Sequence, residues 1–371
     1  MISALWTMGQ IHWFRGEHPE ALAVLERQLQ LATEIGDERG ACEALETLGM
    51  VYWGQGDWDR SASCCLQSIV MAEPLDYKQI ITRASITLGN VRASQHWFGE
   101  ALHWYQRAGV LAGQIDDRRI VSWASSNIAM VLAKRGDYRR ALAGYTRSLS
   151  NAWQIGDRWT ACLNVAGLAS VNERLGRLDL AESLYRNAIE LGRSLGIPSY
   201  LSSMMVSMTR LLLAQQRALE ARAFYGEALE RIAGVAGERL AGEDTRFDAR
   251  VLGIRLRCAL AETLPAAAVE EVLGLLYQET APHRRAALNY ELWRLAPHDE
   301  GARAAAAAFY RSHYLETGDE ESRNRCLELT GETLPDPPPL PDVSALIPDE
   351  PDDFDLATLL AELEASFDSA P

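Results

Sequence analysis

The side chains of this 371-residue chain that could carry out chemistry are six cysteines, seven histidines and many closely spaced carboxylates. Zinc sites use ligands at short, defined spacings, and the sequence contains neither a CxxC pair nor an HExxH motif. His96 and His103 lie seven residues apart, which leaves two interpretations: a metal site, or ordinary histidines of a turn and a helix surface. The second is favoured because we expect the two residues on different helices.

The cysteines do not indicate redox or nucleophilic chemistry. They are Cys42, Cys64, Cys65, Cys162, Cys258 and Cys326. Adjacent residues of a helix point about 100° apart, so a disulfide between Cys64 and Cys65 would be strained. We expect one packed and one partly exposed thiol at this pair. In a chain of this length without a secretory signal, all six should be reduced thiols of a cytoplasmic protein.

Enzymatic chemistry needs a constellation of residues that this sequence does not supply. A GxxxxGK[ST] phosphate-binding loop is missing, and the two lysines, Lys78 and Lys134, lie outside any glycine-rich loop. Paired acids such as Glu43 and Glu46 fit a solvated helix face, whereas glycoside hydrolysis would also require a pocket. We therefore expect no enzymatic activity, no metal and no cofactor.

The charge distribution argues against two classes of partner. Residues 335–371 contain ten acids and no Lys or Arg, so most of the net charge of −15 lies in this short tail. The nearly neutral body has no surplus of Lys and Arg for a phosphate backbone or an anionic membrane surface. No apolar run reaches the ~18 residues of a membrane-spanning helix. We expect neither nucleic acid nor membrane as a partner.

The elements that position these residues follow a forty-residue period over residues 1–240. The blocks are 1–40, 41–80, 81–120, 121–160, 161–200 and 201–240. The ninth place is small (Gly9, Gly49, Gly89, Ala129, Ala169, Thr209), and so is the twenty-first (Ala21, Ser61, Ala101, Ala141, Ala181, Ala221). The twenty-fifth place is mostly large (Leu25, Cys65, Tyr105, Tyr145, Tyr185, Tyr225). Such a repeat predicts stacked copies of one small structural unit.

Each block reads as two antiparallel helices joined by a tight turn. Apolar residues such as Leu45, Leu48 and Tyr52 recur at helical spacing, and a glycine such as Gly56 marks the turn. Small residues at the ninth and twenty-first places permit close approach of paired helices, and the bulky residue at the twenty-fifth place should fill the space beside them. Block 81–120 lacks the first glycine turn, with Gln95 and His96 in its place.

These columns resemble the tetratricopeptide repeat, in the forty-residue variety found in bacterial signalling proteins. The resemblance implies an all-α, right-handed superhelical solenoid of antiparallel helix pairs, with six repeats over 1–240. Residues 241–334 are expected to form degenerate helical repeats and a closing helix, at 246–260, 265–278, 283–295, 299–315 and 319–330. This part also resembles the C-terminal region of large bacterial multidomain proteins in which a switch ATPase, sometimes with a nucleotide cyclase domain, precedes the repeats.

Residues 335–371 form the third segment. Prolines and acids over 335–351 predict an extended, solvated linker, followed by a short amphipathic helix. The apolar residues of that helix are Phe354, Leu356, Leu359, Leu360, Leu363 and Phe367. Two interpretations of this tail remain open. It is disordered in the absence of a partner, or it forms a recognition helix that docks on the array or on a neighbour.

The resemblance also implies that the first helix of each block lines a concave groove. The groove residues expected from their places in the blocks are Trp6, Gln10, Trp13, Glu46, Met50, Trp53, Arg83, Asn90, Trp123, Met130 and Lys134, with Phe14, Glu43 and Ile86 at equivalent places. The tryptophans have two interpretations: packing against neighbouring helices, or an aromatic ladder that binds a peptide. Asn90 could hold a peptide amide, and Arg83 and Lys134 an acidic group.

Two functions follow. The first is a non-enzymatic protein–protein interaction scaffold that binds a partner peptide or domain on the concave face. The alternative is the sensor or regulatory arm of a multidomain nucleotide-binding switch ATPase or cyclase. Trp6, Trp13 and Phe14 lie close to an open N-terminal end. Because terminal repeats usually carry a polar face, we expect an upstream segment or self-association to cover this end.

Overall fold

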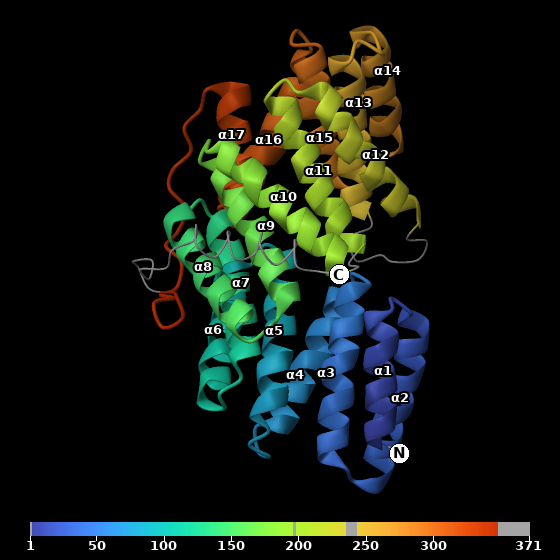
Figure 1. Cartoon of the computed structure of the whole chain (residues 1–371), viewed down its shortest axis with the longest axis vertical. Helices are drawn as coiled ribbons and strands as arrows, with labels where there is room; N and C mark the ends of the chain where they lie inside the picture. Colours follow the sequence, from blue (N-terminus) through green and yellow to red (C-terminus); the bar gives the residue numbers. More distant parts are fainter. Residues whose placement is uncertain (1, 196–197, 235–242, 348–371) are drawn as a thin grey trace.

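The fold is a curved stack of helices. The computed structural model describes residues 2–195, 198–234 and 243–347, and over these ranges it contains seventeen helices and no strand. Consecutive helices pack against one another from α1 to α17, and together they form an elongated solenoid (Figure 1). The predicted all-α solenoid of antiparallel helix pairs is confirmed.

The first six helix pairs coincide with the forty-residue blocks. They are α1 (Ile2–Phe14) with α2 (His18–Ile35), α3 (Glu38–Gly54) with α4 (Trp58–Ala72), α5 (Lys78–Ser94) with α6 (Phe98–Gln114), α7 (Arg118–Lys134) with α8 (Tyr138–Gln154), α9 (Arg158–Arg174) with α10 (Leu178–Leu195), and α11 (Pro198–Ala214) with α12 (Ala218–Gly234). The odd-numbered helix is the first helix of each pair and the even-numbered helix is the second.

Small and large residues meet inside each pair. A Cβ added to Gly9 would lie 2.5 Å from Leu25 Cδ2, and one added to Gly89 would lie 2.6 Å from Tyr105 Cδ1. Leu25 and Tyr105 are both completely buried. The bulky residue at the twenty-fifth place therefore fills the space left by the small ninth place, as the sequence predicts.

The turns within pairs need a left-handed residue. Gly56 and Gly136 adopt φ of 76° and 78°, a conformation that glycine reaches without a Cβ clash. In the third and sixth pairs, which lack this glycine, His96 and Gln216 take the same conformation with φ of 59° and 62°. The block 81–120 thus keeps the turn of its neighbours at a cost of about 1 kcal/mol of backbone strain.

Five further helices follow the six pairs within residues 243–347. They are α13 (Glu243–Ala259), α14 (Pro265–Gln278), α15 (Pro282–Leu295), α16 (Glu300–Thr317) and α17 (Glu320–Thr330). Pro265 and Pro282 stand at the starts of their helices, where a missing N–H costs nothing. The division at residues 240 and 334 remains a prediction.

Helices α16 and α17 fold back onto the rim of the array, the edge formed by the turns at the C-terminal ends of α5, α7 and α9. The ring of His313 stands 4.7 Å from that of His96, nearly perpendicular to it. Arg174 at the end of α9 forms an ion pair of 2.7 Å with Glu321. The last helices therefore brace repeats that lie far away in sequence.

The segment after α17 also lies on the array. We name residues 331–347 the strap; it leaves α17 and runs along α8 and α6 (red in Figure 1). Its residues up to Val343 form neither helix nor strand, and most residues of the strap are exposed. The linker assigned to residues 335–351 remains a prediction. Val343, Leu346 and Ile347 are buried in the main core of the array. Residues 348–371, which include the expected amphipathic helix from Phe354 to Phe367, lie outside the described residues.

Candidate partner-binding groove

The first helices lie on the inner side of the curved array. Each first helix contacts the next first helix, from α1 with α3 to α9 with α11, whereas successive second helices make at most slight contact with one another. Elements on the inside of a curve are closer together than those outside it. The concave face is therefore formed by α1, α3, α5, α7, α9 and α11.

A buried ion pair joins α3 to α5 beneath this face. Glu46 has no exposed surface, and its carboxylate oxygens lie 3.1 and 3.2 Å from Nη2 and Nε of Arg83. Trp6 from α1 covers the pair, because its ring lies 5.4 Å from the Arg83 guanidinium carbon and its Nε1 donates to Thr47 Oγ1 at 3.0 Å. The completely buried Glu46 thus binds the partly exposed Arg83, so the two charges are paired with each other. The expectation of a solvated helix face is wrong for Glu46.

Two further tryptophans bridge neighbouring first helices. Trp53 Nε1 on α3 lies 3.5 Å from Ser94 Oγ on α5, and Trp123 Nε1 on α7 donates to Thr160 Oγ1 on α9 at 2.7 Å. Both side chains are only half-buried. The indoles therefore pack between helices, and part of each ring still faces the groove.

Met50, Asn90 and Met130, at the tenth place of three successive blocks, form a strip across α3, α5 and α7, and Asn90 lies at its centre. Its Oδ1 accepts hydrogen bonds from Tyr105 Oη at 2.8 Å and from Asn127 Nδ2 at 3.3 Å. These two hydrogen bonds fix the side chain of Asn90, so that its amide nitrogen points away from Tyr105 and Asn127. Met50 and Met130, both half-buried, occupy the same tenth place in the blocks before and after. The arrangement is a fixed amide flanked by two adaptable thioethers.

The remaining expected residues lie at the edges of the strip. Gln10 and Trp13 on α1 are half-buried, and Trp13 packs against the core of the first pairs. The side chain of Phe14 lies outside the described residues. Lys134 is exposed at the end of α7 and approaches the rim, where its charge acts on His96 and His313.

A polar cluster that was not predicted from the sequence lies further along the same face. Arg210 Nε on α11 lies 3.3 Å from Glu173 Oε1 on α9, and Tyr185 Oη donates to Glu173 Oε2 at 3.0 Å. Glu173 and Arg210 occupy the thirteenth and tenth places of their blocks. The places that select Trp53 and Asn90 in earlier blocks would have selected them, so the signal was present.

Comparison with a family model supports the assignment of these repeats. The model described as "Tetratricopeptide repeat" matches residues 1–73 and 159–234, which cover the first and last parts of the six-pair array. The chain carries tetratricopeptide repeats. No curated protein matches the sequence.

Solved structures resemble the fold over most of the chain. The Rap conjugation gene regulator of plasmid pLS20, in complex with the Phr* peptide, is 12% identical with a TM-score of 0.60, covering 89% of this chain and 98% of that one. NprR in complex with its cognate peptide NprX is 14% identical with a TM-score of 0.60, covering 84% and 86%. The signal transduction ATPase with numerous domains and a tetratricopeptide repeat sensor from Pyrococcus horikoshii is 13% identical with a TM-score of 0.56, covering 87% and 50%. At these identities the likeness concerns the fold.

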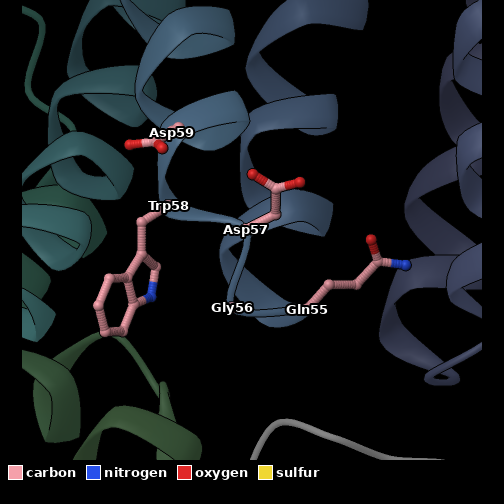
Figure 2. Close-up of a pocket in the computed structure, with 5 residues that line it drawn as sticks. All are labelled: Gln55, Gly56, Asp57, Trp58 and Asp59. Carbon is pink, nitrogen blue, oxygen red and sulfur yellow. The ribbon is translucent and has the colours of Figure 1, made fainter.

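A second depression lies at the turn between α3 and α4 of the tetratricopeptide array (Figure 2). Its five lining residues, Gln55 to Asp59, are consecutive, and Figure 2 shows that the side chains of Gln55, Asp57 and Trp58 point away from one another. Asp57 Oδ1 already accepts from Arg60 N at 3.1 Å and caps α4. This turn therefore brings no groups together around a ligand.

The described part of the chain offers neither a metal site nor a membrane-spanning helix. Within it, no three His, Cys, Asp or Glu residues are grouped so that they could hold a metal ion. Among the helices described, none is both long and apolar enough to cross a membrane.

Proposed function

We propose that this tetratricopeptide array is a non-enzymatic scaffold that binds an extended peptide segment of a partner protein along α1, α3, α5 and α7. The observation that carries the proposal is the tenth-place strip: Asn90, immobilised through its oxygen, presents its amide N–H groups between Met50 and Met130. A donor fixed in place binds a peptide carbonyl without first losing side-chain entropy.

The chemistry of the strip indicates the kind of peptide. The charges of Glu46 and Arg83 are paired, as are those of Glu173 and Arg210, so the strip is close to neutral. Half-buried Trp53 and Trp123 add apolar surface at its edges. The expected ligand is an extended peptide with apolar side chains on both sides of one well-placed carbonyl. That NprR and the Rap regulator are described in complexes with peptides supports the proposal.

The test uses a phage-displayed library of random short peptides, selected on the full chain and then measured by calorimetry. Asn90→Asp keeps an acceptor for Tyr105 and Asn127 but removes the donor, so we expect binding about tenfold weaker. Met50→Ala should also weaken it. The control is Val70→Ala, at an exposed residue of α4 on the convex side. Equal affinity of Asn90→Asp and Val70→Ala would reject the proposed site.

A second candidate is the sensor arm of a larger switch ATPase. It is favoured by the likeness over 87% of this chain to a protein with a tetratricopeptide repeat sensor, of which the match spans only half the length. An in-frame nucleotide-binding module encoded directly upstream of residue 1 would support this candidate. An upstream reading frame without such a module would leave the scaffold as the function.

A further inference from the structure

Two glycines interrupt columns that are otherwise occupied by bulky residues. Gly109 on α6 occupies the twenty-ninth place of its block, and Gly144 on α8 occupies the twenty-fourth place of the next block. At the other junctions the same two places pair Leu29 with Cys64, Ile69 with Trp104, Leu149 with Leu184 and Ile189 with Phe224. The junction between the third and fourth pairs therefore lacks the side chains that its neighbours carry on both sides.

The strap supplies the missing side chains. A Cβ added to Gly109 would lie 3.0 Å from Leu346 Cδ2, and one added to Gly144 would lie 2.6 Å from Ile347 Cδ1. The same two Cβ atoms would lie 3.1 Å from Ala124 and 2.9 Å from Ala129, both on α7. Leu346 and Ile347 thus enter a socket with α6 and α8 as walls and α7 as floor.

The socket lies on the convex side. Second helices diverge there, so each junction opens a gap above the first helix, and large residues at the two places fill it. With glycine at both places the gap stays open to a chain from outside. It is separate from the concave strip around Asn90, which lies on the opposite face of the array.

Polar contacts align the strap above the socket. Gln106 on α6 donates from Nε2 to the carbonyl oxygen of Asp342, and Arg135 donates to the carbonyl oxygen of Pro338. Asp342 Oδ1 then accepts from Ser344 N at 2.9 Å and starts the turn that carries Leu346 and Ile347 into the gap. These contacts bind a proline-rich segment that is followed by an Asp-capped turn with two aliphatic residues.

We infer that the gap between Gly109 and Gly144 is a peptide-binding site, whose ligand class is an Asp-capped turn ending in two aliphatic side chains and whose resident ligand is the strap of the same chain. Because the ligand is a short linear segment, the site also accepts a free peptide of this sequence once the strap is displaced. When the strap occupies the site, it connects α17 to the third and fourth helix pairs. When the strap is released, this connection is lost.

The first test measures release of the strap in the full chain by hydrogen exchange. The amides of Leu346 and Ile347 both donate to the Val343 carbonyl, at 3.0 and 2.9 Å, and report on the turn. Gly109→Leu restores the residue type of the other blocks and should speed exchange in the strap about 100-fold. The matched control is Gly113→Leu on the same helix, where an added Cβ meets nothing within 4 Å; there the strap should stay protected. Equal protection in both variants, with native helix content, would overturn the inference.

The second test works from the strap side and does not depend on Gly109→Leu folding. In the full chain, Leu346→Asp with Ile347→Asp should vacate the socket while leaving the array unchanged. A synthetic peptide of residues 334–347 should then bind this variant and should bind the intact chain at least about tenfold more weakly, because the resident strap competes. Adding Gly144→Leu to the vacated variant should abolish binding. Peptide binding that ignores Gly144→Leu, or no binding to the vacated variant, would refute a site at this position.

Discussion

Removing the carboxylate of Glu46 isolates the interaction that joins the first helices beneath the groove. Glu46→Ala leaves the Arg83 guanidinium beneath Trp6 without a counter-charge. Breaking a completely buried ion pair costs about 3–5 kcal/mol. The Arg83 side chain keeps 26% of its surface exposed and can turn toward water, so we expect a loss of about 2 kcal/mol in the free energy of unfolding.

The assay is urea unfolding of the full chain, followed by far-UV circular dichroism. A double-mutant cycle of Glu46→Ala, Arg83→Ala and the double variant should give a coupling energy of about 1–2 kcal/mol. Glu20→Ala, at an exposed residue of α2, is the control and should change stability by less than about 0.5 kcal/mol. A coupling energy near zero would refute a structural role for the Glu46–Arg83 ion pair. Glu46 would then be interpreted as a groove residue that is available to a ligand.

Three other predictions concern the rim and the repeat columns. Burial is the main cause that lowers the pKa of His96 to about 4, from an ordinary value of 6.5. Because the folded state favours the neutral ring, protonation of His96 as pH falls from 6.5 toward 4 should destabilise the contact with α16. Hydrogen exchange should then show α16 detaching over this pH range, and less so in His96→Asn. Burial raises the pKa of Glu321, but Arg325, Arg174 and Arg210 outweigh burial and lower the pKa to about 2. The charged carboxylate of Glu321 therefore stabilises the fold fully above pH 4.5, and this contribution is lost as pH falls toward 2. The stability lost in Glu321→Gln should accordingly be smaller in acid than at neutral pH. Gly89→Leu should destabilise the chain by about 3 kcal/mol through overpacking against Tyr105, whereas Gly99→Ala, with open space around it, should raise the melting temperature slightly.

The helix pairs were predictable because their causes are local. Within one block, sixteen residues separate the ninth-place glycine from the bulky residue at the twenty-fifth place. The contact of Gly89 with Tyr105 therefore requires only the single turn that joins the two helices of the pair. The start of α14 at Pro265 was predictable for the same reason. Even the turn at His96 follows from its neighbours, because the pairing of α5 with α6 requires a left-handed residue there.

The rim and the strap were not predicted because they depend on the curvature of the whole array. Nothing near His313 indicates that it will meet His96, more than two hundred residues earlier. The socket had a signal, since Gly109 and Gly144 break their columns, but its meaning depends on knowing which two places face each other across a junction. The acidic, proline-rich part of the strap is mostly exposed, as its composition favours. The burial of Val343, Leu346 and Ile347 depends on a matching gap that the sequence of the strap does not reveal.

The burial of Glu46 was also beyond the sequence. A carboxylate at the sixth place of a block is on the groove side, and its availability depends on what the next first helix places opposite it. Arg83 lies 37 residues further along, close to one repeat, and reaches back across the junction. The strip as a binding site therefore remains a prediction, while the pairing of charges beside it required the structure.

The most direct test of the account is a crystal structure of the full chain with a peptide selected from the phage-displayed library. We predict an extended peptide on the concave face across α1, α3, α5 and α7, with a carbonyl oxygen within hydrogen-bond distance of Asn90 Nδ2 and side chains against Met50 and Met130. A peptide bound outside this face, at the Gly109–Gly144 socket or at the turn of Asp57, would contradict the proposed groove.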